Sequence, residues 1–254
     1  MHQTEKANIT AEVLAEIRAA VVDGTIDEVS AAGLRRKAEK VRANASYIDG
    51  CILLGHIEGW RWNLKGVVSN FESALRQGTS SRLLRHYSIA LRLAGDYFRS
   101  SAASERAADT SKADLDLLRA AIADAKIIGM HAKAGAMIVD YAKRTPDRAP
   151  TQNDAWEIGL QLTERLASSG VAPDLASRCH EVAMRLLSEN KIRVEGARFE
   201  VDDEQRQGGV FCFLRAGASQ DVLDVLDDEL AVLLFDEIRD LDLNAYWIGY
   251  EATK

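Results

Sequence analysis

Proline is scarce in this chain. Only Pro146, Pro150 and Pro173 occur among its 254 residues, and all three lie in the second half. Because proline costs roughly 3 kcal/mol inside a helix, its absence from the first half leaves long helices free to form. Alanine and leucine are abundant, and both lose little conformational freedom on entering a helix. The composition therefore favours a mainly helical protein.

Long apolar runs are also missing. No segment approaches the ~20 apolar residues that a membrane-spanning helix requires, so we expect no membrane span. Residues 1–6 are not followed by the apolar segment of a secretory signal peptide. Cysteine is limited to Cys51, Cys179 and Cys212, which are far apart and have apolar neighbours. This pattern is typical of buried thiols in a reducing compartment, and predicts a cytoplasmic protein.

The common catalytic motifs are absent as well. The chain contains no GxxxxGK[ST], GxGxxG or HExxH segment, which excludes the usual nucleotide-binding loops and one class of zinc site. His56-Ile57-Glu58 matches the H-x-E that opens zinc deaminase sites, but the closely spaced cysteine ligands of those sites are missing. We therefore expect no catalytic residue, metal or cofactor from any of these motifs.

The clearest pattern present is a helical one. Its apolar residues are spaced three or four apart, as on one face of a helix: Leu64, Val67, Val68, Phe71, Ala74 and Leu75. Gly78 provides a stop, and Thr79-Ser80-Ser81 provides the cap of the next helix. The same alternation of apolar periodicity and capping residues recurs along the chain. It predicts helices over 10–23, 28–43, 46–61, 64–77, 81–99, 112–143 (with a break at Gly129), 152–167 and 174–189, with a loop over 100–111.

The pattern changes after residue 190. Residues 191–202 alternate between apolar and polar with a shift at Gly196, which predicts a strand with a bulge. Gln207-Gly208-Gly209 is typical of a turn, and 210–214 of a buried strand. A helix is predicted from Ser219, although 230–235 would also suit a strand. Residues 245–250 complete a β-β-α-β order.

We predict a mainly α protein, namely a helical bundle or irregular α-solenoid of antiparallel helix pairs with a small C-terminal α/β part. Residues 1–144 are expected to form a helical repeat or bundle domain, and 145–151, with two prolines, a linker. Further helices are expected in 152–190, and a small acidic α+β domain in 191–254.

Residues 47–78 resemble one tetratricopeptide repeat unit. Leu54-Gly55 on one helix and Phe71 and Ala74 on the next fit the spacing of that family. The resemblance covers about an eighth of the chain, and the pattern does not recur 34 residues later, where Ser88-Ile89 stands. It implies an antiparallel helical hairpin.

Charge is unevenly distributed. From Phe199 onward there are 14 acidic and 4 basic residues, a net charge of −10, whereas the remainder carries +3; together they give the net −7 of the chain. Arg85, Arg92 and Arg99 repeat every seven residues in the basic part. The two charged surfaces are the candidate binding surfaces.

Three functions are compatible with these patterns. The first is a non-enzymatic adaptor or regulator that binds a protein partner through a helical surface with the residues Trp60, Trp62, Arg82, Arg85, Arg92 and Arg99. The second is an inhibitor or immunity-type protein, including a nucleic-acid mimic, that acts through the acidic residues Asp221, Asp224, Asp227 and Asp228. The third is a nucleic-acid-processing enzyme assembled around His56, His86 or His131. A protein partner is favoured over nucleic acid because the chain is acidic overall, and self-association stays open.

Overall fold

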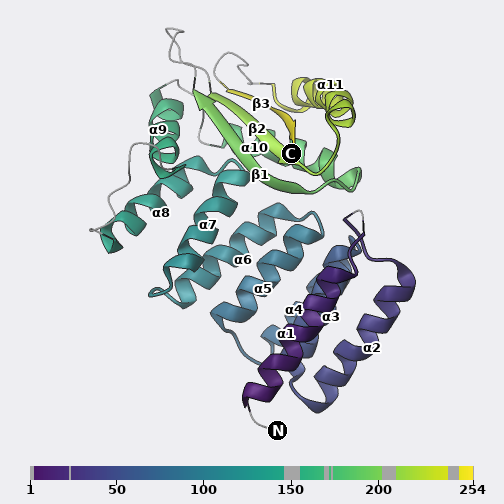
Figure 1. Ribbon diagram of the computed structural model, residues 1–254. Coiled ribbons are helices and arrows are strands. Elements are labelled where there is room, and N and C mark those ends of the chain that lie inside the picture. Colours follow the sequence, from purple (N-terminus) through teal and green to yellow (C-terminus); the bar gives the residue numbers. More distant parts are fainter. Residues whose placement is uncertain are drawn as a thin grey trace. The chain divides into compact units, whose positions relative to one another are not determined.

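The computed structural model describes residues 3–22, 24–145, 155–168, 172, 174–201, 210–239 and 246–253 (Figure 1). The chain forms two compact units, Met1–Ala113 and Asp114–Lys254. The first is helical; the second combines helices with a small sheet. The predicted fold class, mainly α with a small C-terminal α/β part, is therefore confirmed.

The first unit is built from short helices with well-defined starts. Its elements are α1 (Gln3–Ala19), α2 (Glu28–Asn44), α3 (Tyr47–Trp60), α4 (Leu64–Leu75), α5 (Ser81–Leu93) and α6 (Tyr97–Thr110). From α2 to α6, each helix begins after a side chain that accepts a hydrogen bond from an N–H of the first turn: Asp27, Ser46, Asn63, Ser80 and Asp96. Local sequence therefore sets where these helices start.

Helix α3 is the central helix of this unit and contacts α1, α2, α4 and α5. All of its residues from Gly50 to Gly59 are buried. Glycine lets neighbouring helices approach closely: a Cβ at Gly55 would lie 2.2 Å from the Phe71 ring, and one at Gly59 would lie 2.8 Å from the Ala90 carbonyl oxygen. Helices α3 and α4 form a helical hairpin at residues 47–75; the tetratricopeptide resemblance itself stays a prediction.

Two predictions in this unit are wrong. The helix expected over 81–99 ends at Leu93, because Gly95 adopts φ +82° and Asp96 caps a new helix. The loop expected over 100–111 is helical instead. Its small side chains pack closely against α5, and two of its buried hydroxyls lie within hydrogen-bond distance of Ser88 on that helix: Ser88 Oγ lies 3.2 Å from Ser100 Oγ and 2.9 Å from Ser104 Oγ.

The second unit carries its elements in the order α7 (Leu115–Ile127), α8 (His131–Arg144), α9 (Ala155–Ser168), α10 (Leu175–Glu189), β1 (Val194–Val201), β2 (Val210–Ala216), α11 (Gln220–Glu237) and β3 (Tyr246–Ala252). The predicted break at Gly129 is confirmed, with φ +71°. Residues 230–235 are helical, which excludes the strand alternative. The predicted turn at 207–209 and, apart from Thr145, the predicted linker 145–151 lie outside the described residues.

The sheet has the order β1-β2-β3, with β1 antiparallel and β3 parallel to β2. The register of β1 shifts between Val194 and Gly196, which confirms the predicted bulge. One sheet face, which includes Cys212 and Leu214, is buried, and α7, α9 and α10 contact the strands. Helix α11 contacts β3 and α10 (Figure 1).

Every helix within the described ranges falls short of the length and apolar character that a membrane crossing requires.

Candidate interaction surface

Helix α11 carries apolar residues on two of its sides. The inward side is formed by Leu223, Leu226, Leu230 and Leu234, all buried. The outward side carries apolar residues that water reaches, namely Val225, Val232 and Phe235; Val222 is exposed on another side of the helix. Phe235 is the extreme case, with 83% of its surface exposed. Because phenylalanine is among the residues most often buried, this exposed apolar side is a candidate binding surface.

A pocket of about 440 Å³ opens between α11 and β3. Its walls are mainly apolar, and they are formed by Asp227, Ala231, Leu234, Phe235, Asp236, Ile238, Arg239, Trp247 and Ile248. Pockets of this volume with a few polar groups among apolar side chains are typical binding sites. Phe235 belongs both to the pocket and to the exposed apolar side, so the two features form one continuous surface, called here the α11 groove.

Trp247 forms one wall of the groove, and its position depends on a glycine. A Cβ at Gly249 would lie only 2.1 Å from the outer edge of the Trp247 indole. Phe213 packs against the same indole, with ring centroids 5.3 Å apart. The missing side chain at Gly249 therefore lets the indole lie across the strand.

Of the four aspartates predicted on the acidic surface, Asp227 lines the pocket. Its Oδ1 accepts a hydrogen bond from the backbone N–H of Tyr250, at 2.9 Å. Burial, followed by the neighbouring carboxylates of Asp224 and Asp228, raises the pKa of Asp227 from 3.8 to about 6. The other three, Asp221, Asp224 and Asp228, lie on the same helix, which contains no lysine or arginine. Asp227 thus connects the helix that carries the predicted acidic residues to an apolar pocket.

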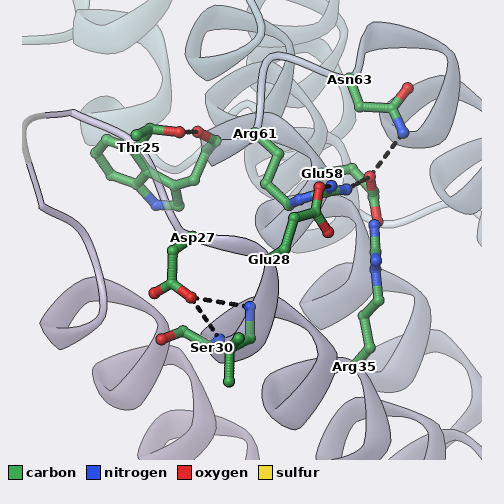
Figure 2. A network of polar contacts seen from close by, with 10 residues as sticks. Thr25, Asp27, Glu28, Ser30, Arg35, Glu58, Arg61 and Asn63 are labelled. Carbon is green, nitrogen blue, oxygen red and sulfur yellow. Dashed lines mark hydrogen bonds and ion pairs between the residues drawn. The ribbon is translucent and has the colours of Figure 1, made fainter.

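The other candidate surface belongs to the first unit and contains Trp60 and Trp62. Both indoles are half-buried, and a polar network fixes the turn that carries them (Figure 2). Glu58, only 7% exposed, accepts hydrogen bonds from Arg35 at 2.6 and 2.8 Å, from Arg61 at 3.2 Å and from Asn63 at 2.7 Å. Figure 2 shows these three side chains converging on one carboxylate. The network joins α2, α3 and the start of α4, which is a structural role.

The predicted arginine row does not run along one helix. Arg82, Arg85 and Arg92 lie on α5, whereas Arg99 lies on α6 beyond the turn at Gly95. Arg82 forms an ion pair with Asp49 at 2.7 Å, and Arg99 with Asp96 at 3.4 Å. These carboxylates already neutralise part of the positive charge that would attract an acidic partner.

Of the histidines suggested for an enzyme, His56 and His131 are buried and His86 is half-buried. His56 Nε2 lies 3.0 Å from His86 Nδ1, and burial together with this mutual proximity lowers the pKa of His56 to about 3; burial lowers that of His86 to about 4. His131 is buried, neither of its ring nitrogens has a hydrogen-bond partner among the described residues, and burial lowers its pKa well below 6.5. These rings are neutral at pH 7. In the described part of the chain, no group of three or more His, Cys, Asp or Glu side chains is arranged to hold a metal ion.

Sequence reasoning missed the apolar half of the α11 groove. Phe235, Trp247 and Ile248 fall in segments that were correctly predicted as helix and strand, but periodicity alone does not show which apolar residues stay exposed. Val232 and Phe235 are three residues apart, on the side of α11 away from its leucines. This spacing was the one sequence signal for a second apolar side of the helix.

Comparisons of the chain with protein-family models, with curated proteins and with solved structures found no match.

Proposed function

We propose that this protein works by binding a protein partner through the α11 groove, as an adaptor, regulator or inhibitor rather than as an enzyme. The observation that carries the proposal is Phe235, which is 83% exposed at the edge of a 440 Å³ apolar pocket. Aromatic residues beside a pocket are the typical centres of binding energy in protein interfaces. The free, buried thiols of Cys51, Cys179 and Cys212 support action in the cytoplasm.

The extent of the exposed surface favours a macromolecule over a small ligand. Val225 and Phe235 are ten residues apart on α11, which corresponds to about 15 Å along a helix at 1.5 Å per residue. A small molecule would fill the pocket and leave the valines in water. A protein segment would cover both.

The partner surface is expected to be basic. Helix α11 carries seven Asp or Glu residues and no lysine or arginine, so complementary charge would speed association and fix orientation. Binding should weaken as salt rises, because exposed charges are screened within about 10 Å at 0.1 M ionic strength. Between the two candidate surfaces, this one is preferred since its carboxylates lie beside a pocket, whereas the arginines Arg82 and Arg99 already have acidic neighbours.

Site-specific photo-crosslinking in cells of the native host tests the proposal. A photoreactive phenylalanine analogue replaces Val232 in the groove or, as the control, Val29, which is 83% exposed on α2. We expect Val232 to give an adduct that Val29 does not give, and mass spectrometry of the adduct identifies the partner. The identity of the partner decides between the two roles: an enzyme as partner would indicate an inhibitor, and another protein would indicate an adaptor.

Two variants then check the chemistry. Phe235→Ser should abolish the adduct, and the pair Asp224→Lys with Asp228→Lys should reduce it strongly. The pair Glu12→Lys with Asp109→Lys changes the net charge equally at exposed positions of the first unit, and should leave the adduct intact. Equal adducts from Val232 and Val29, or no adduct from Val232, would contradict the proposal. An adduct with a second copy of the chain would assign the groove to self-association instead.

A further inference from the structure

Strand β3 is an edge strand: within the described residues it pairs only with β2. Backbone N–H groups of a strand point alternately to its two sides. Thr253 donates to the Ala216 carbonyl at 3.1 Å, which extends the ladder with β2. Residues of the opposite parity, among them Ile248, Tyr250 and Ala252, therefore point their N–H groups away from β2, toward the other edge of the strand.

Helix α11 already occupies part of that edge. The Tyr250 N–H donates to Asp227 Oδ1 at 2.9 Å, and the Ala252 N–H donates to Gln220 Oε1 at 3.0 Å. These side chains act in place of a neighbouring strand, and so prevent pairing at the C-terminal half of β3. The edge is thus closed by side chains where α11 lies against it.

Ile248 comes two residues before Tyr250, and its N–H points to the same side. No group among the described residues accepts a hydrogen bond from this N–H. Ile248 also lines the pocket, next to Trp247 and opposite Phe235 of α11. The α11 groove therefore combines an apolar pocket with an unpaired backbone group of an edge strand.

We propose that the partner enters the groove as an extended segment that pairs with β3 at Ile248, places one apolar side chain in the pocket, and turns a lysine or arginine toward Asp227 and Asp228. This inference rests on the proposed function and specifies the shape and chemistry of the partner. Strand addition of this kind takes affinity from main-chain hydrogen bonds and specificity from a pocket for alternate side chains.

Charge and geometry favour an extended basic segment over a helix. A helix satisfies its own backbone groups and would leave the Ile248 N–H unpaired, which is unfavourable when water is excluded. The pocket wall carries two carboxylates, Asp227 and Asp236, against one arginine, Arg239, and this excess of negative charge complements a basic residue beside the apolar anchor. Because Asp227 and Gln220 close the edge from Tyr250 onward, the pairing is short, and the pocket adds affinity as well as specificity.

A peptide selection on the full chain tests this inference. Phage-displayed random dodecapeptides are selected against the wild-type protein and counter-selected against Phe235→Ser, which removes an exposed side chain and should leave the fold unchanged. We expect enriched peptides to combine one large apolar residue with a lysine or arginine nearby. Residue-resolved amide hydrogen exchange by NMR then follows Ile248 with and without the best peptide.

Saturating peptide should slow exchange of the Ile248 amide at least tenfold, whereas the Tyr250 amide, already bonded to Asp227, should change little. A groove-bound peptide that leaves Ile248 exchange unchanged would overturn strand addition. A selection that yields no peptide sensitive to Phe235→Ser would overturn it as well. The cross-linking experiment at Val232 is independent of these results and decides the proposed function by itself.

Discussion

The Nε2 atom of His180 lies 2.6 Å from the hydroxyl oxygen of Tyr246, inside the second unit. His180 Nδ1 lies 2.6 Å from the carbonyl oxygen of Ile127, and a carbonyl only accepts, so Nδ1 carries the proton. Burial lowers the pKa of His180 to about 4. The ring is therefore neutral at pH 7, Nε2 is the acceptor, and Tyr246 donates. This chain of bonds joins α7, α10 and β3.

Tyr246→Phe should destabilise the protein by about 1–3 kcal/mol, because it keeps the ring but leaves His180 Nε2 buried without a donor. Tyr250→Phe is the matched control. It removes a hydroxyl that donates to the Ala183 carbonyl at 2.7 Å, but this carbonyl also accepts the bond of its own helix, so the loss should be smaller, about 0.5–1.5 kcal/mol. Denaturant unfolding measures both, and equal losses would contradict the assigned donor.

Stability should fall as the pH falls from about 6.5 to 5. Burial lowers the pKa values of His56, His86 and His180 to about 3, 4 and 4, whereas an unfolded histidine titrates near 6.5. In this range the unfolded chain binds protons that the folded chain does not, so each histidine contributes up to about 1.4 kcal/mol of loss per pH unit. The raised pKa of Asp227, about 6, acts in the opposite direction in the second unit.

The measurement is the free energy of unfolding at several pH values between 5 and 7.5. Replacing both members of the His56–His86 pair by glutamine removes two titrating groups, so the dependence on pH should become weaker in that variant. If the free energy of unfolding of the wild-type protein did not change between pH 5 and 7.5, the conclusion that these rings are neutral in the folded state would be wrong.

Glu58→Gln should cost about 2 kcal/mol. The change keeps the size of the side chain but removes the charge that Arg35 and Arg61 share at a buried position. Glu16→Gln is the control, because Glu16 pairs with Lys37 at the surface with 46% of its side chain exposed. Exposed pairs contribute little, so this loss should stay below about 0.5 kcal/mol. Comparable losses from the two variants, measured by thermal and denaturant unfolding, would refute a structural role for Glu58.

Gly249→Ala should change the groove more than the fold. An added methyl group would meet the outer edge of the Trp247 indole, and that end of the side chain is free to swing, so the indole should leave its place in the pocket wall. Fluorine NMR of fluorotryptophan-labelled protein should show one resonance shifted. Binding of groove-selected peptides should weaken about tenfold, equivalent to 1.4 kcal/mol. An unchanged Trp247 resonance would show that the indole keeps its position beside the added methyl group, which would contradict this prediction.

Much of the fold follows from local patterns. Local residues determine where helices begin and end. Capping side chains such as Ser80 and Asp96 accept hydrogen bonds from N–H groups of the first turn, and Gly129 reverses the direction of the chain after a helix. The parity shift at Gly196 likewise predicted the bulge. Helix α6 was missed because its core side is made of Ala and Ser, whose burial becomes favourable only when α5 lies close enough for the hydroxyls to bond each other.

The sequence by itself determined the helical class, the β-β-α-β order and the concentration of carboxylates on α11, because each depends on periodicity or on composition. Tertiary structure decided which apolar residues of α11 are buried, how Trp247 lies over Gly249, and which N–H groups of β3 are capped by Asp227 and Gln220. Those features depend on residues distant in sequence that meet only after folding, so no local pattern contains them. The leucines of α11 have partners in the core, and Phe235 does not; only packing separates the two.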